Sequence, residues 1–256
     1  MRIGLSRRRA LQALTIGTAG AGLSGTYPAV AAEPAAAVNP QGVCVLFPQA
    51  LEGPFYFDPK LVRSDIAEAR AGAPLQISLR VIESGVCTPI TNARVDIWHA
   101  DASGIYSGYA SQGPERNMSA TGETYLRGTQ MTDADGVVKF RSVYPGWYPG
   151  RTPHIHVKVF LDAATLVTGQ IYFPDGLSAQ VYKERAPYND RPIPDTTNAS
   201  DFIFTSGERD GGGTVLSVNA EGDAIVAALL IAIDRSGAAA RKAEGWGGWL
   251  RTVMGW

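Results

Sequence analysis

Short runs that alternate apolar and polar residues restrict most strongly how this chain can fold. The clearest are residues 75–81, 93–98 and 154–160. Side chains two apart point to the same face of a strand, so this alternation predicts strands with one buried face. Turn residues separate the runs, as in Asp101-Ala102-Ser103-Gly104. The pattern predicts an all-β protein built as an antiparallel β-sandwich or barrel, and we favour the sandwich.

Alternation alone leaves several segments undecided. Residues 224–233 are apolar throughout and suit either a buried helix or a strand buried on both faces. We favour the strand because the surrounding pattern is β. A short helix is expected around residues 64–70. The sandwich would span 75–237, preceded by an N-terminal arm at 32–74. The irregular Gly/Trp-rich tail at 238–256 would cover the core, lie disordered or join a subunit interface, which leaves a homo-oligomer open.

Length and charge set limits on function. The chain has 256 residues, 45% of them apolar, and a formal net charge of −1. This supports one sizeable core and a single domain. Lys and Arg form no block after the N-terminus, so a nucleic-acid partner has no electrostatic support.

The N-terminus has the features of an export signal. Arg7-Arg8-Arg9 precede an apolar run at 10–25, and Ala29-Val30-Ala31 matches a small-residue cleavage site. Paired arginines favour twin-arginine export over an ordinary Sec signal. A stable membrane anchor is disfavoured, because Gly and Thr interrupt a run near the roughly 18-residue minimum for a spanning helix. We expect residues 1–31 to be removed and the mature protein to be periplasmic or secreted.

The two cysteines, Cys44 and Cys87, fit that destination. In an oxidising compartment one disulfide is the natural expectation. Two unpaired thiols are the alternative, since spacing cannot show that the two Cβ atoms face each other.

Two of the three histidines form His154-Ile155-His156. On a strand both imidazoles point to one face, as a metal ion requires. No cysteine cluster exists, so thiolate zinc and iron–sulfur sites are excluded, whereas a nearby carboxylate could still complete a facial triad. Phenolate ligation requires a strongly Lewis-acidic cation such as ferric iron. The candidate phenols are Tyr106, Tyr109, Tyr144 and Tyr148.

Several of these motifs together resemble the intradiol ring-cleavage dioxygenases. Residues 145–156, with Tyr148-Pro149 before the histidines, resemble the C-terminal signature of that family. Residues 95–106 are similar to its strand-Trp-turn-Gly-x-Tyr element. The likeness extends over roughly 51–233. Two departures are the short connection of six positions from Tyr148 to His154 and the export signal.

The resemblance implies a mononuclear non-haem Fe(III) with four protein ligands: Tyr106, Tyr148, His154 and His156. Tyr106 would also accept a substrate proton. Arg151 would stabilise negative charge on the ring, unless it pairs with a surface carboxylate. Gln170 would line the site, unless it is an ordinary polar strand residue. Tyr56 would contact substrate or pack in the core. His99 would lie behind the ligands or at the surface.

The implied activity is cleavage of a catechol-type aromatic by O2, between its hydroxyl-bearing carbons, to a cis,cis-muconate-type diacid. The short ligand loop suggests a pocket open to bulky rings, but the sequence does not choose among catechols. One alternative is a non-catalytic β-sandwich binding module with a vestigial metal site. Another is a zinc or copper enzyme built on the two histidines.

Overall fold

A computed structural model describes residues 44–113 and 115–240, and its strands form two layers. The expected export signal at 1–31 and most of the tail at 238–256 lie outside these residues. The strands are β1 Pro74–Glu83, β2 Arg94–Trp98, β3 Arg127–Met131, β4 Val137–Val143, β5 His154–Leu161, β6 Ala164–Tyr172, β7 Ser217–Glu221 and β8 Ala224–Ile233. The helices are α1 Asp175–Glu184 and α2 Phe202–Arg209, with short 3₁₀ turns η1 Tyr188–Asp190 and η2 Asn198–Ser200.

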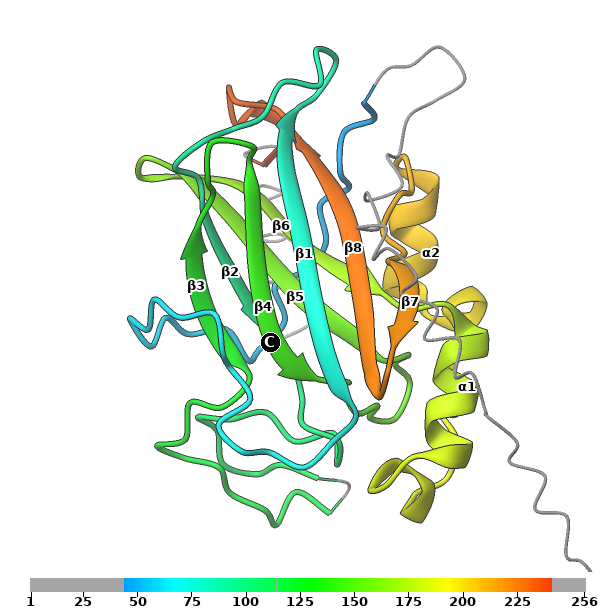
Figure 1. Cartoon of the computed structure of the whole chain (residues 1–256). Helices are drawn as coiled ribbons and strands as arrows, with labels where there is room; N and C mark the ends of the chain where they lie inside the picture. Colours follow the sequence, from blue (N-terminus) through cyan, green and yellow to red (C-terminus); the bar gives the residue numbers. More distant parts are fainter. Residues whose placement is uncertain (1–43, 114, 241–256) are drawn as a thin grey trace, which may run out of the picture. The chain divides into compact units, whose positions relative to one another are not determined.

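The strands form two four-stranded sheets, ordered β4-β1-β8-β7 and β3-β2-β5-β6, which face each other as a sandwich (Figure 1). The predicted β-sandwich is therefore confirmed. The pairing differs from the prediction at one place, because β1 and β8 run parallel while the other paired strands run antiparallel. The long connection through α1 and α2 leads from β6 to the edge strand β7, and β8 then returns antiparallel to β7 through a short turn and pairs with β1 on its other side.

Alternation along each strand builds the core between the sheets. On β1, Leu75, Ile77 and Leu79 are buried in the main hydrophobic cluster. On β5, Ile155 and Val157 join that cluster. The two histidines of β5 alternate with these core residues and therefore point to the outer face of the second sheet.

The strand favoured for residues 224–233 is confirmed as β8. Its odd-numbered residues enter the main core, whereas Leu230 and Ala232 pack on the other face against Cys44 and Ile82. Burial on both faces explains the continuous apolar sequence. The expected disulfide is confirmed, since Cys44 is bonded to Cys87 across a sequence separation of 43.

The helix expected around residues 64–70 is wrong. Ile66 is completely buried, and its amide donates to the carbonyl of Arg141 at 2.9 Å. Asp65 also forms a bridge to Arg141 beside β4. Glu68 and Ala69 have positive φ angles, which end any helical course. The segment is held by hydrogen bonds to strands, so contacts distant in sequence override a weak local helix preference.

Residues 50–63 cross the outer face of the second sheet and are called here the covering segment. The amide of Ala50 donates to Thr168 of β6 at 2.8 Å, and that of Arg63 donates to Thr129 of β3 at 3.0 Å. The segment therefore passes over β5 and β2, the strands between them in the sheet. Within the described part of the chain, no helix has the length and apolar character needed to cross a membrane.

Candidate metal centre

Strand β5 places both imidazoles on the outer face of its sheet. His154 and His156 are 2% and 3% exposed, so the covering segment removes them almost completely from water. The register sets His156 opposite Trp98 of β2, and the two rings stack at 4.8 Å with an interplanar angle of 13°. Trp98 is almost completely buried, and its stacking fixes the plane of one imidazole.

A tight turn after β2 delivers Tyr106 to the same place. One carboxylate oxygen of Asp101 accepts hydrogen bonds from the amides of Ser103 and Ile105, at 2.9 and 3.0 Å. Gly104 has a φ of +83°, and a Cβ there would lie 2.4 Å from the carbonyl oxygen of Trp147. Only glycine allows this turn to dock so closely on the chain before Tyr148.

Tyr148 lies in a turn closed by a hydrogen bond from the Arg151 amide to its carbonyl oxygen, at 3.0 Å. Gly150 supplies the left-handed conformation in that turn, with φ +79°. Tyr148 precedes His154 by only six positions, so this short connection keeps Tyr148 close in space to the histidines.

The four donor atoms converge on one point. Nε2 of His154 lies 3.4 Å from the Tyr106 hydroxyl, 3.2 Å from the Tyr148 hydroxyl and 3.3 Å from Nε2 of His156. Nε2 of His156 lies 3.1 Å from the Tyr106 hydroxyl. Metal–ligand bonds of about 2.0–2.1 Å in a tetrahedral arrangement separate donor atoms by about 3.3 Å. The spacing therefore fits one metal ion among the four side chains.

The protonation states of the histidine side chains at the centre suit the binding of a cation. Nδ1 of His154 lies 2.7 Å from the carbonyl oxygen of Thr152, which places the proton on Nδ1 and leaves Nε2 with its lone pair. Burial holds the pKa of both histidines well below the ordinary value, so both imidazoles are neutral. Burial also raises the pKa of Tyr106 and Tyr148, so phenolate at either position needs a strong positive charge beside it.

The chemistry of the donors indicates which metal they fit. Two phenolic oxygens and two imidazole nitrogens form a hard, mixed set that suits oxidised iron. The described residues contain no group of three His, Cys, Asp or Glu side chains able to hold a metal ion. A metal in this place would therefore be held with the help of the two tyrosines. Within the same residues, the buried Nδ1 of His156 has no hydrogen-bond partner.

Arg151 and Gln170 lie beside the four donors. Arg151 directs Nη1 at the Tyr148 hydroxyl, 3.4 Å away, and donates from Nη2 to the side-chain oxygen of Gln170. The Tyr172 hydroxyl also donates to that oxygen, at 3.0 Å. The side-chain amide of Gln170 donates to the carbonyl oxygen of Leu51, near the start of the covering segment, at 3.2 Å. The alternative in which Arg151 pairs with a surface carboxylate is wrong, because the carboxylate that it contacts, Asp201, is completely buried.

Sequence reasoning missed Asp201. This residue stands just before a helix, and an aspartate in that position is an ordinary capping signal. No local signal connects it to Arg151, which lies 50 residues earlier.

The covering segment packs directly on the centre. Phe55 stacks on the Tyr106 ring at 4.5 Å, and a Cβ on Gly53 would lie 3.4 Å from the His156 ring. Lys158 and Glu52 form an ion pair at 2.5 Å between β5 and the segment. Tyr56 donates its hydroxyl to Asp96 at 2.9 Å, and its ring packs on Trp98 with the ring centres 4.8 Å apart, which agrees with the packing alternative.

The remaining candidates lie away from the four donors. His99 is buried, with Nδ1 at 2.8 Å from the Ala100 carbonyl and Nε2 at 2.7 Å from the Ser142 hydroxyl, so a surface position is wrong. The Tyr109 hydroxyl donates to the backbone of Tyr56 at 2.8 Å. The Tyr144 hydroxyl pairs with Ser178 at 2.7 Å.

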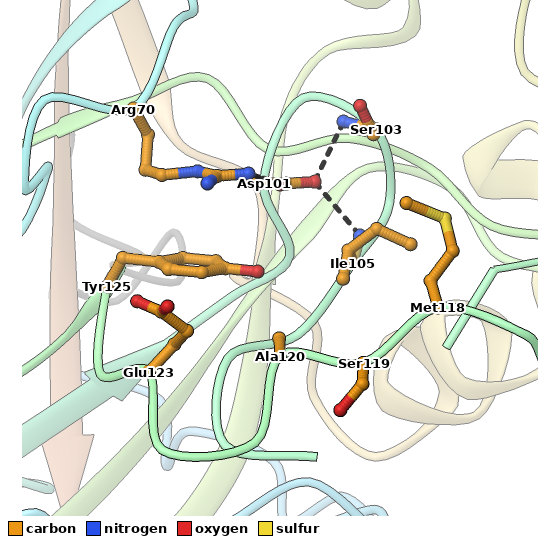
Figure 2. A pocket seen from close by; sticks show the side chains of 9 residues that line it. All are labelled: Arg70, Asp101, Ser103, Ile105, Met118, Ser119, Ala120, Glu123 and Tyr125. Carbon is orange, nitrogen blue, oxygen red and sulfur yellow. Dashed lines mark hydrogen bonds and ion pairs between the residues drawn. The ribbon is translucent and has the colours of Figure 1, made fainter. Parts of the chain in front are cut away.

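A separate cavity of about 260 Å³ lies beside the turn that carries Tyr106. Figure 2 shows Arg70 directed at Asp101, whose carboxylate reaches the amides of the turn. The Arg70 guanidinium also lies 4.2 Å from the centre of the Tyr125 ring. The cavity wall includes neither the tyrosines nor the histidines of the metal centre. Its lining residues are Arg70, Asp101, Ser103, Ile105, Met118, Ser119, Ala120, Glu123 and Tyr125.

Fold and site together define a β-sandwich protein with a candidate tyrosine–histidine metal centre. The family model described as Dioxygenase matches residues 51–181, about half of the chain. This chain therefore belongs to the intradiol ring-cleavage dioxygenase family, whose members typically use non-haem Fe(III).

Solved structures agree with that family. An intradiol ring-cleavage dioxygenase from Tetranychus urticae is 33% identical, with a TM-score of 0.67, over 75% of this chain and 95% of that one. The dioxygenase domain of a dioxygenase–carbohydrate-binding fusion from Streptomyces sp. SirexAA-E is 26% identical, with a TM-score of 0.54, over 74% and 98%.

Curated relatives match over shorter stretches. A protocatechuate 3,4-dioxygenase beta chain from Burkholderia cepacia is 34% identical over 113 residues, which are 40% of this chain and 46% of that protein. The chain spans about half the length of the curated relatives it matches.

Proposed function

We propose that this protein is an exported, Fe(III)-dependent intradiol dioxygenase. It would open a catechol-type ring with O2 between the two hydroxyl-bearing carbons, giving a cis,cis-muconate-type diacid. The observation that carries the proposal is the convergence of two phenolic oxygens and two imidazole nitrogens, with separations of 3.1–3.4 Å, in a buried centre. Family membership supports the class of reaction.

The residues that would hold the iron are Tyr106, Tyr148, His154 and His156. When bound, ferric iron would supply a Lewis acid for both catechol oxygens and a template for reaction of the ring with O2. Tyr106 would be the base for one of the substrate protons, because a phenolate oxygen is basic at neutral pH.

Arg151 and the covering segment prepare the surroundings of the ring. The Arg151 guanidinium faces the Tyr148 hydroxyl, so its fixed charge favours negative charge developing on a bound ring. Phe55, stacked on Tyr106, excludes water from one side of the centre. A drier site strengthens the interaction of Arg151 with an anionic substrate.

Mass spectrometry of the ring-opened product formed under labelled O2 tests the reaction. The iron-loaded protein is given catechol, protocatechuate, hydroxyquinol and bulkier lignin-derived catechols in separate reactions. We expect both labelled atoms in a diacid cleaved between the hydroxylated carbons, and a visible tyrosinate–iron absorption. A colourless protein with full metal loading and no product across the panel would indicate a binding module instead.

Export is part of the proposal. The disulfide between Cys44 and Cys87 supports an oxidising compartment, where such bonds persist. N-terminal sequencing of the protein from the periplasm or culture medium should give a mature chain that begins near residue 32. Protein found only in the cytoplasm, still carrying residue 1, would contradict export.

A further inference from the structure

Asp201 lies beyond the part of the chain that matches the family model, which ends at residue 181. Its side chain is 0% exposed and lies against Arg151, whose side chain is 15% exposed. We propose that Asp201 is the positioning residue for Arg151, so that the carboxylate which begins helix α2 also orients the guanidinium at the metal centre. This inference rests on the proposed function for its catalytic consequence.

One oxygen of the Asp201 carboxylate serves the active site. Oδ2 accepts a hydrogen bond from Nε of Arg151 at 2.8 Å and another from the amide of Thr152 at 3.1 Å. Thr152 lies two residues before His154, where β5 begins, so the same oxygen contacts both Arg151 and the segment that leads into the strand with the two imidazoles. A charge-assisted bond of this kind is short and directional.

The other oxygen serves helix α2. Oδ1 accepts from the amides of Ile203 and Phe204, at 2.9 and 3.2 Å, as a helix cap does. All four partners of the carboxylate are N–H donors, which only the ionised form satisfies completely. Asp201 therefore joins the first turn of α2 to the guanidinium of Arg151.

The orientation of Arg151 follows from that bond. With Nε held by Asp201, the rigid planar fork turns its two remaining nitrogens toward the metal centre. Nη1 then faces the Tyr148 hydroxyl at 3.4 Å, and Nη2 donates to Gln170. Without Asp201 the long side chain would lose its fixed rotamer and the partner that balances its buried charge.

The variant Asp201→Ser separates the two roles of the carboxylate. Serine is a good helix cap, but its short side chain cannot reach Arg151. The matched control is Ser206→Gly, which weakens α2 without changing Asp201 or Arg151. Kinetics of the iron-loaded enzyme are compared in the wild type, D201S, R151M, the D201S/R151M double variant and S206G.

We expect D201S to lower kcat by about 10- to 100-fold with a smaller change in KM, because a misplaced charge chiefly weakens transition-state stabilisation. In the R151M background, D201S should change kcat less than about twofold, since the residue it positions is gone. S206G should lower the unfolding temperature and leave kcat unchanged. Equal losses of kcat in both backgrounds, or a loss reproduced by S206G, would overturn the proposal.

A second measurement needs neither iron nor activity. In a proton–nitrogen NMR spectrum of metal-free protein, the Nε–H signal of Arg151 is assigned by its absence in R151M. We expect slow exchange with solvent in the wild type and S206G, and loss of protection in D201S. Unchanged protection in D201S would overturn the proposal even if the wild type cleaves no catechol. If D201S does not fold, D201N, which keeps the shape and removes the charge, is measured in the same way.

Discussion

Replacing Gly104 with alanine should disturb the metal centre through a single methyl group. The residue has φ +83°, and a left-handed conformation costs an L-residue about 1–2 kcal/mol. The new Cβ would also lie 2.4 Å from the backbone oxygen of Trp147. Because backbone must shift to relieve that contact, we expect a further cost of about 1–3 kcal/mol. The total loss of unfolding free energy is about 2–5 kcal/mol.

Gly122→Ala is the matched control. Gly122 has nearly the same backbone conformation, φ +84°, but a Cβ there meets nothing within 4 Å. It should lose only the backbone cost of about 1–2 kcal/mol. The difference between the two variants therefore measures the docking of the Tyr106 turn on the chain before Tyr148.

Equilibrium urea unfolding gives both free energies, and the visible absorption of the iron-loaded protein reports the two phenolates. We expect G104A to lose more stability than G122A and to bind iron with altered absorption, while G122A keeps the wild-type spectrum. Equal losses of stability in the two variants, with identical spectra, would refute the reasoning.

Three further predictions concern other parts of the structure. Tyr148→Phe should remove most of the visible absorption and weaken iron binding more than about tenfold. Tyr109→Phe, which lies outside the centre, should keep the absorption and the iron affinity of the wild type. Metal titration monitored by absorbance measures both quantities. Replacing Cys44 and Cys87 together with serine should lower the unfolding free energy by about 4 kcal/mol, because the disulfide closes a loop of 43 residues. Urea unfolding in non-reducing buffer measures the loss, and an unchanged midpoint would contradict the prediction. Burial lowers the pKa of His99 from 6.5 to about 4, so the unfolded chain takes up a proton at a higher pH than the folded one. Stability should then fall by about 3 kcal/mol as the pH drops from 6.5 to 4, and His99→Gln should show a shallower slope across that window; equal slopes would count against the assignment.

The strands and the placement of the histidines could be predicted from sequence because both depend on local geometry. A period of two fixes which side chains share a face, so His154 and His156 had to point the same way on β5. The motif order around Tyr106 and Tyr148 suggested the four-donor centre. Each of those tyrosines is placed by a glycine-containing turn that can be recognised in the sequence.

Other features arise from contacts that are far apart in the chain. Residues 64–70 have some helical character, yet their long-range hydrogen bonds go to Arg141 of β4 and to Leu126, just before β3, and Ile66 is completely buried. The parallel pairing of β1 with β8 joins residues about 150 positions apart, which no local pattern specifies.

The sequence by itself determined the all-β fold class and supplied the residue types able to hold an oxidised metal, and it made one disulfide the natural expectation. Only the tertiary structure decided that the four donor atoms meet, that residues 50–63 cover them and that Asp201 holds Arg151. The physical reason is range: strand alternation and turns depend on neighbours in the chain, whereas a buried charge takes whichever partner the packing of distant segments brings to it.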